Sequence, residues 1–466
     1  MKKLIAMLMA AVMVFSLTAC GNNNSTTTTA AADKTTAAST TAASTDVAAD
    51  TTEAAPEVNP YLVTEPITIK WWHSLETQYD ELIAEIVDNF NKTNEYGITV
   101  EAEYIGNYAT LNETLVSAQA AGSGLPAISV SGSNYIGNYG SSGMAEELAP
   151  YVEAYGMDLT DFFDGMLEMS YVNDTLVSLP FLVSTQVLYY NADKVAEKNL
   201  TVPTEWADVA DFVNASVEKD ASGNVTFWGG YFAGWDYAYF LPMFMNQGVK
   251  LIDVEENTTD LNSEAAVKVV EGVQELVQSG VAQWAYGSGS SATMRKTFYE
   301  GNAMFTVHTS SLYNTYIDNI DGKFELGMAW YPGVDGTANT TLGGSNIFIP
   351  AINDQATKNA AFVFLMYLTG AETNVKWAEG TGYLLTRKSV IDSEEGKAHL
   401  EAKPAFKNIY DNLSKALPKI EHTCYTDMGD LLKSYLNLII IEGEDAQEQL
   451  DLCAEELQEL LEEAAE

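Results

Sequence analysis

A strand, a helix and a second strand follow one another between residues 67 and 104. Residues 67–72 alternate apolar and polar side chains and are rich in β-branched residues, which predicts a strand. Apolar residues then recur at helical spacing over residues 82–90, and residues 98–104 alternate again. This order forms a βαβ unit, in which the two strands are parallel and the helix covers one face of the sheet. The chain is therefore expected to have an α/β fold.

The same two patterns recur along the rest of the chain. Helical spacing is found at residues 265–277 and 360–368, and short apolar strands are expected at 187–190 and 347–350. A last helix is expected from residue 446 onward. At 466 residues the chain is longer than one hydrophobic core usually supports, so two domains are expected.

The chain is strongly acidic. It has 65 Asp and Glu residues against 23 Lys and Arg residues, which gives a formal net charge of -42 at pH 7. Such a chain repels nucleic acid and anionic membrane surfaces, because both are bound through Lys and Arg. The acidity is expected to keep the protein soluble outside the cell, and it indicates no particular ligand.

The first twenty residues predict export. Lys2 and Lys3 precede an apolar run from residue 4 to residue 17, which is too short to span a bilayer but suits a signal peptide. The segment Leu17-Thr18-Ala19-Cys20 then resembles the bacterial lipoprotein box, in which the Cys thiol becomes the site of lipid attachment. We therefore expect residues 1–20 to be a lipoprotein signal peptide that ends at the lipid anchor Cys20.

Residues 21–60 are expected to form a disordered tether. They are mostly Ser, Thr, Ala, Asn and Asp, and they cannot bury enough apolar surface to offset the entropy lost on ordering. The tether would hold the folded part near the extracytoplasmic face of a bacterial cell membrane. No second apolar run of about twenty residues follows, so the lipid is the only membrane attachment expected.

Apart from Cys20 the chain has two cysteines, Cys424 and Cys453. They could pair in an oxidising compartment, and the sequence leaves this open. Cys453 shares one face of a helical pattern with apolar residues at 446, 450, 457, 460 and 461. It is therefore expected to be buried as a small hydrophobic residue.

Several short segments occur in a fixed order along the folded part of the chain. They are Trp71-Trp72-His73-Ser74, Phe90-Asn91, Gly106-Asn107-Tyr108, Leu125-Pro126-Ala127, Pro180-Phe181, Ser184-Thr185, residues 187–191, Pro203-Thr204-Glu205-Trp206, residues 298–304 and Gly382-Tyr383-Leu384. Each segment is weak alone, but their order and spacing together are specific. They resemble the type 1 extracellular solute-binding proteins of ABC transporters, a family that contains maltose-binding and glycerol-3-phosphate-binding proteins. The resemblance covers residues 67–466.

This resemblance implies a two-lobed, periplasmic-binding-protein-like fold of type II. Hinge strands would link the two lobes, and the ligand would lie in the cleft between them. Lobe I is expected to contain residues 61–184 and 308–384, and lobe II residues 185–307 and 385–466. A ligand contacted by both lobes binds the closed state more tightly and shifts the population toward it.

The resemblance also implies ligand-binding residues. Tyr108 aligns with a ligand-contacting Tyr of the glycerol-3-phosphate-binding branch, Ser184 lies in its Ser-Thr crossing motif, and Tyr383 matches the Tyr of its Gly-Tyr-Leu motif. Gly344 resembles a turn in which a missing Cβ lets backbone amides approach a ligand, although a tight turn explains it equally well. Aromatic faces and hydroxyl groups are what recognition of a sugar requires.

Four further residues are candidates for the site. Trp235 resembles a Trp whose ring faces the ligand in this family. Thr309 and Ser310 follow a strand where the family places a hydroxyl, and which of the two contacts the ligand stays open. His73 ends the first strand, where α/β folds gather ligands, but a lone His is more often structural.

Two segments depart from the glycerol-3-phosphate-binding branch. Residues 129–134 hold no carboxylate where that branch has a Glu, and Ser133 is the candidate in this loop. Residues 423–427 hold no Arg, so the bidentate partner of a phosphate is absent there, and Tyr425 suggests stacking instead. Both changes favour an uncharged sugar or oligosaccharide over a phosphate ester.

The expected function is capture of a small carbohydrate and its delivery to the permease subunits of an ABC importer. The chain would act as a monomer without a cofactor. A glycerol phosphate or phosphodiester ligand and a sensory role remain alternatives. The sequence shows no nucleophile motif such as Gly-x-Ser-x-Gly, and its 4 histidines lack metal-ligand spacing, so neither an enzyme nor a metal-binding protein is expected.

Overall fold

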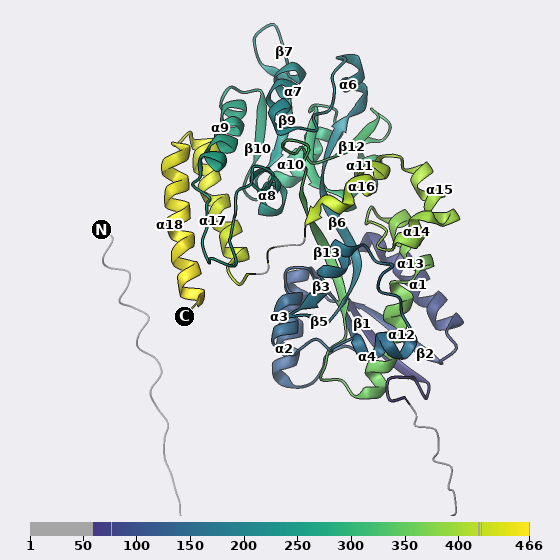
Figure 1. Cartoon of the computed structure of the whole chain (residues 1–466). Helices are drawn as coiled ribbons and strands as arrows, with labels where there is room; N and C mark the ends of the chain where they lie inside the picture. The colour runs from purple at the N-terminus through teal and green to yellow at the C-terminus, as the bar shows by residue number, and fades with distance from the viewer. Residues whose placement is uncertain (1–58, 76, 418–419, 421, 466) are drawn as a thin grey trace, which may run out of the picture. The chain divides into compact units, whose positions relative to one another are not determined.

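The fold is seen in a computed structural model that describes residues 59–465 except 76, 418–419 and 421 (Figure 1). The predicted signal peptide, the lipid anchor Cys20 and the predicted tether up to residue 58 lie outside the described residues. Within the described part, no helix is long and apolar enough to cross a membrane.

A mixed sheet of ten strands runs through the described part of the chain. Its strands are β1 (Ile67–His73), β2 (Ile98–Tyr104), β3 (Ile128–Gly132), β6 (Leu179–Asn191), β9 (Gly230–Ala233), β10 (Ala282–Ala285), β11 (Phe305–Thr309), β12 (Leu326–Trp330), β13 (Thr340–Phe348) and β14 (Ala416–Leu417). Their order is β10-β9-β11-β6-β13-β3-β1-β2, with β12 paired to β6 and β14 paired to β13. Two small hairpins are formed by β4 (Tyr171–Val172) with β5 (Thr175–Leu176), and by β7 (Glu218–Lys219) with β8 (Val225–Phe227).

Helices cover the sheet along its length (Figure 1). They are α1 (Asp80–Thr93), α2 (Tyr108–Ala121), α3 (Ile136–Ser141), α4 (Ala149–Tyr155), α5 (Asp164–Glu168), α6 (Ala192–Glu197), α7 (Val209–Ser216), α8 (Leu241–Met245), α9 (Glu264–Gln278), α10 (Ser290–Tyr299), α11 (Tyr313–Ile320), α12 (Gln355–Leu368), α13 (Ala371–Gly380), α14 (Lys388–Asp392), α15 (Glu394–Ala402), α16 (Ala405–Asn412), α17 (Tyr425–Asn437) and α18 (Ala446–Ala465). Shorter 3₁₀ turns and a π-helical turn, Leu438–Glu442, complete the helical structure of the described residues.

The βαβ unit predicted from the sequence is present. Strands β1 and β2 are parallel and stay in register from the pair Ile67 and Ile98 to the pair His73 and Tyr104. Helix α1 connects them and buries an apolar face that contains Ile86. The predicted α/β class is confirmed.

Strand β6 is the central element of the sheet, with 13 residues. Its first half pairs antiparallel with β13, from Leu179 to Thr185. Its second half, from Val187 to Asn191, lies between β11 and β12. β6 therefore pairs with strands at both ends of the sheet. Its pairing partner changes near Thr185, from β13 to β11 and β12.

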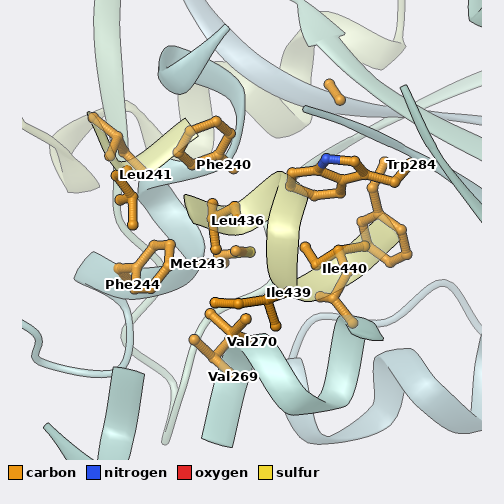
Figure 2. Close-up of a cluster of buried hydrophobic side chains, with 14 of the residues drawn as sticks. Phe240, Leu241, Met243, Phe244, Val269, Val270, Trp284, Leu436, Ile439 and Ile440 are labelled. Carbon is orange, nitrogen blue, oxygen red and sulfur yellow. The ribbon is translucent and has the colours of Figure 1, made fainter. Parts of the chain in front are cut away.

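Two large hydrophobic cores lie at opposite ends of β6. The first core contains residues of β1, β3, α1 and α12, such as Trp71 and Phe364. Figure 2 shows part of the second core, in which α8 with the residue before it, α9, β10, α17 and the π-helical turn contribute Phe240, Leu241, Met243, Phe244, Val269, Val270, Trp284, Leu436, Ile439 and Ile440. Burying one such side chain fully stabilises the fold by about 1.5–3 kcal/mol.

A third cluster of buried side chains lies around the middle of β6 and includes Val183, Val187 and Leu384. These residues flank the positions at which the sequence predicts crossings between lobes. The predicted lobe boundaries remain a prediction.

The C-terminal cysteines are both buried free thiols, Cys424 before α17 and Cys453 on α18. Cys453 is fully buried within the second core, as its helical pattern predicts. Burial raises the pKa of its thiol to about 12, so the thiol stays protonated at neutral pH.

Candidate ligand-binding site

Tyr108 and Tyr383 lie next to each other at the middle of the sheet. Tyr108 is the first residue of α2, which begins there because the Asn107 side chain accepts a hydrogen bond from the Thr110 N–H group (3.0 Å). Tyr383 is held by the chain on its C-terminal side, where the Leu384 N–H group donates to the Val183 carbonyl of β6 (2.8 Å). Two predicted site residues from distant parts of the sequence thus share one location.

Burial governs the chemistry of these two tyrosines. It raises the pKa of both hydroxyl groups, and neighbouring hydroxyl groups of Ser345 and Ser74 partly oppose this at Tyr108. Ser311 acts in the same way at Tyr383. Both tyrosines therefore stay neutral at physiological pH, and they belong to a group of hydroxyls that can donate and accept hydrogen bonds.

Ser133 directly follows β3, and Ser184 and Gly344 lie on β6 and β13 in the same region. Ser184 is buried and stands opposite Gly343 in the β6–β13 pair. The Ser133 N–H group donates to the Gly344 carbonyl (3.1 Å), which ties the loop after β3 to β13. Three predicted residues therefore meet where β13 pairs with β6, next to the end of β3. This region is the strand junction.

Gly344 has a structural reason to be glycine. Its φ is +104°, and a Cβ atom at this position would lie 1.9 Å from the carbonyl oxygen of Leu182 on β6. The residue is part of β13, just before a register shift between Ser345 and Asn346, and it is not in a turn. The missing side chain lets two strands approach each other, whether or not a ligand contacts the backbone there.

Thr309 and Ser310 differ in their availability. Ser310 is fully buried, and its hydroxyl accepts a hydrogen bond from the Thr185 N–H group (3.2 Å). Thr309 is half-buried and shares a hydrogen bond between its hydroxyl and that of Ser311 (3.0 Å). The carbonyls of both residues accept the Tyr189 hydroxyl (2.9 and 3.1 Å). Of the two, Thr309 keeps the hydroxyl that a ligand could reach.

Trp235 belongs to an aromatic group that includes His308 of β11. Its ring centroid lies 5.1 Å from that of Tyr239 and 5.4 Å from that of His308. The tryptophan is half-buried, and it packs against the second core. Part of its indole therefore remains accessible for stacking on a ligand.

A first cavity, of about 310 Å³, brings Ser133 and Tyr425 together. Its lining comes from both large cores, with Ile136 of α3 in the first and Tyr425 of α17 in the second. The Tyr425 ring packs edge-on against Tyr237, with centroids 5.7 Å apart and planes at 87°. The other lining residues are Asn134, Gly137, Asn138, Ser141, Met169, Val172, Asn173, Ile420, His422, Thr423 and Thr426.

A second cavity, of about 630 Å³, contains residues that the sequence did not suggest. Arg295 of α10 and His308 of β11 line it, together with Ser311 and Thr381. Burial and the Arg295 charge lower the pKa of His308 to about 3, so its imidazole is neutral at physiological pH. Neither residue lies in a motif or at a recognisable spacing, so only the folded chain brings them together.

The predicted residues thus fall into three neighbouring groups. Tyr108, Ser184, Gly344 and Tyr383 stand at the strand junction, Ser133 and Tyr425 line the first cavity, and Trp235 packs on His308 beside the second. Ser311 connects two of these groups, because it lies beside Tyr383 and also lines the second cavity. His73 is buried, and its pKa is lowered to about 4 by burial. Among the described residues, no cluster of His, Cys, Asp and Glu could hold a metal ion.

Comparison with known proteins identifies relatives of the sequence and of the fold. The sn-glycerol-3-phosphate-binding periplasmic protein UgpB of Shigella flexneri is 26% identical over 365 residues, which cover 72% of this chain and 78% of the relative. The structure of Mycobacterium tuberculosis UgpB in complex with glycerophosphocholine superposes with a TM-score of 0.74 at 19% identity, covering 86% of this chain and 100% of the other. The sugar-binding protein MalE of Xanthomonas citri gives a TM-score of 0.74 at 19% identity, covering 85% and 98%.

Both solved structures share the two-lobed solute-binding fold, which confirms the fold predicted for this chain. The family described as bacterial extracellular solute-binding protein matches residues 85–408. That match spans more than half of the sequence, and so the chain belongs to the bacterial extracellular solute-binding protein family.

Proposed function

We propose that the chain is the substrate-binding protein of an ABC importer and that it captures a sugar or oligosaccharide for the permease. The first cavity carries this proposal. Within the described part of the chain, its lining contains no Asp, Glu, Lys or Arg, but it offers hydroxyl and amide groups and the ring of Tyr425. A sugar needs this combination, because its hydroxyls require hydrogen bonds and its CH face requires an apolar surface.

The position of the cavity supports capture by two bodies that close on a ligand. Ile136 belongs to the core at one end of β6, and Tyr425 belongs to the core at the other end. A ligand that contacts both ends gains interactions only when they are close together, so it favours the closed arrangement. Binding without bond cleavage is sufficient for this role.

The membrane attachment is part of the same proposal. A lipid on Cys20 and a tether over residues 21–60 would keep the binding protein next to the permease. Membrane fractionation of the producing bacterium tests this, and a Cys20→Ser chain that stays with the membrane would contradict it.

A phosphodiester is the second candidate ligand. It is favoured by the relatives named for glycerol 3-phosphate and by the neighbouring structure with glycerophosphocholine. A sensory binding protein would have the same fold and would differ only in the partner that recognises the closed state.

A thermal-shift screen with sugars, oligosaccharides and glycerol phosphodiesters decides between these ligands. A true ligand at 100 times its Kd raises the free energy of unfolding by about 2.7 kcal/mol. We expect oligosaccharides to stabilise the protein, and stabilisation by phosphodiesters alone would show that the sugar proposal is wrong.

A matched pair of variants then locates the binding site. Asn134 is exposed and lines the first cavity, so Asn134→Ala should weaken sugar binding by about 5- to 30-fold through a lost hydrogen bond. Asn214 is exposed on α7, and its side chain donates only to the Ala210 carbonyl of the same helix (2.9 Å). Asn214→Ala should leave the affinity unchanged, as measured by titration calorimetry. Equal affinities in the two variants would exclude the first cavity as the site.

A further inference from the structure

The second cavity holds a cation that forms no ion pair with any of the described residues. The sequence contains two arginines, Arg295 and Arg387. Arg387 is satisfied by the fold, since its Nη1 pairs with Asp161 (3.3 Å) and its Nε donates to the Thr369 carbonyl (2.6 Å). Arg295 forms no ion pair with any described residue, and its Nε is buried without a hydrogen-bond partner.

The groups around Arg295 do not neutralise it. Tyr299 and Tyr316 lie beside it, and both are neutral because burial raises the pKa of their hydroxyls. Asp318 lines the same cavity but is exposed and does not pair with Arg295. The Asp236 carboxylate, which also acts on Tyr239, accepts the Ala238 N–H group (3.0 Å) and forms no ion pair with Arg295. An unpaired cation that is partly withdrawn from water favours an anion as its partner.

His308 adds an unsatisfied donor to the same cavity. Its Nδ1 accepts a hydrogen bond from the Thr309 N–H group (2.8 Å), so the proton of the neutral ring sits on Nε2. The side chain is 5% exposed, and Nε2 has no hydrogen-bond partner within the described part of the protein. A buried N–H group without an acceptor is unfavourable unless a ligand supplies one.

We propose that Arg295 and His308 form a subsite for an oxyanion, a carboxylate or phosphate group carried by the sugar ligand. The guanidinium can bind two oxygens of such a group at once, and the imidazole Nε2–H can donate to the same group. The inference rests on the proposed sugar-binding function and narrows its substrate class to acidic sugars. The sequence favoured an uncharged ligand because residues 423–427 hold no Arg. In this proposal Arg295 of α10 supplies the cation that those residues lack, so an acidic ligand is favoured instead.

Titration calorimetry with matched ligands tests the subsite on the purified protein. The panel pairs uronic acids and sugar phosphates, as monomers and short oligomers, with their neutral counterparts, and includes inorganic phosphate. We expect the charged member of at least one pair to bind tenfold or more tightly than the neutral member. Arg295→Gln should abolish that preference and leave the affinity for the neutral member unchanged, whereas Arg295→Lys should keep part of the preference.

Lys296 provides the control on the same helix. Its side chain is 77% exposed and pairs with Glu300 (3.8 Å), so Lys296→Gln removes the same charge without changing the cavity. A loss of preference as large in Lys296→Gln as in Arg295→Gln would overturn the subsite, because long-range charge alone would then explain it. The thermal midpoint of each variant shows whether it is folded.

The remaining outcomes separate the subsite from the proposed function. If neutral sugars bind as tightly as their charged counterparts, the protein binds sugars and the oxyanion subsite is wrong. If no sugar binds but phosphate binds in a manner that requires Arg295, the subsite is supported and the sugar proposal is wrong. If no anion in the panel binds, the subsite is wrong.

Discussion

Gly344 shows how one residue can serve the sheet, the ligand or both. Its φ of +104° and the 1.9 Å approach of a Cβ atom to the Leu182 carbonyl predict that Gly344→Ala destabilises the fold by about 2 kcal/mol or more. The neighbouring Gly343 has only the Ser184 hydroxyl near its Cβ position, at 3.8 Å, so Gly343→Ala should change stability by less than about 1 kcal/mol. Urea unfolding of both variants measures the difference. A stable Gly344→Ala protein that binds its ligand poorly would instead assign the residue to the ligand.

At this scale the sequence suggested the tyrosines and hydroxyls of the strand junction but missed the second cavity. Tyr108 and Tyr383 stand in short motifs, and short motifs can be recognised in a single sequence. Arg295 looks like any solvated residue of a helix, and His308 like any polar residue of a strand. What distinguishes them is that the Arg295 Nε and the His308 Nε2 are buried without a hydrogen-bond partner among the described residues, and this depends on α10, β11 and α11 meeting in space.

Helix α9 stabilises the end of α17 through side-chain amides. Gln274 donates to the carbonyl of Ile439 (2.8 Å) in the π-helical turn and to the carbonyl of Glu444 (2.9 Å) just after it, where regular helical hydrogen bonds end. Gln274→Ala leaves these carbonyls without that donor and should lower the free energy of unfolding by about 1–3 kcal/mol. Glu275 is exposed one residue further along, so Glu275→Ala should cost less than about 0.5 kcal/mol. Equal urea midpoints for the two variants would mean that water replaces the glutamine.

Periodic elements were predicted well, and strands containing glycine or hydroxyl residues were predicted too short. The helix expected at 265–277 is α9, and the strand expected at 98–104 is β2 with the same bounds. The strand expected at 347–350 begins earlier, as β13 at Thr340, because Gly343 and Gly344 interrupt the apolar alternation. Such residues are tolerated in β13 because β3 and β6 pair with it on both sides.

At the scale of the whole molecule, the sequence predicted a two-lobed α/β fold, but it did not show that one sheet runs through the chain. Parallel βαβ units can be recognised locally. The antiparallel pairing of β6 with β13 joins segments that are far apart in sequence, and no local pattern encodes that pairing. The same long-range pairing creates the strand junction where the candidate site lies.

We expect the free energy of unfolding to fall at acidic pH, because three histidines are buried in their neutral form. Burial lowers the pKa to about 4 for His73 and His399 and to about 3 for His308, where the charge of Arg295 adds to the effect. The unfolded chain takes up a proton at each site near pH 6.5, and the folded chain takes it up only at lower pH. The stability that these neutral histidines contribute is therefore complete above pH 6.5 and is lost as pH falls toward their folded pKa values.

Between pH 7.5 and pH 5 each of the three histidines should remove up to about 2 kcal/mol from the free energy of unfolding. His399 tests this best, since it packs against Phe406 and lines neither of the two cavities of the candidate site. Urea unfolding at both pH values should show a large loss in the wild type, and His399→Gln should reduce that loss by up to about 2 kcal/mol. An identical loss in wild type and variant would show that His399 takes up its proton in the folded state as readily as in the unfolded chain. The acid sensitivity would then have to arise elsewhere, because carboxylates with lowered pKa values, such as Asp161 and Glu218, become protonated mainly below this pH range.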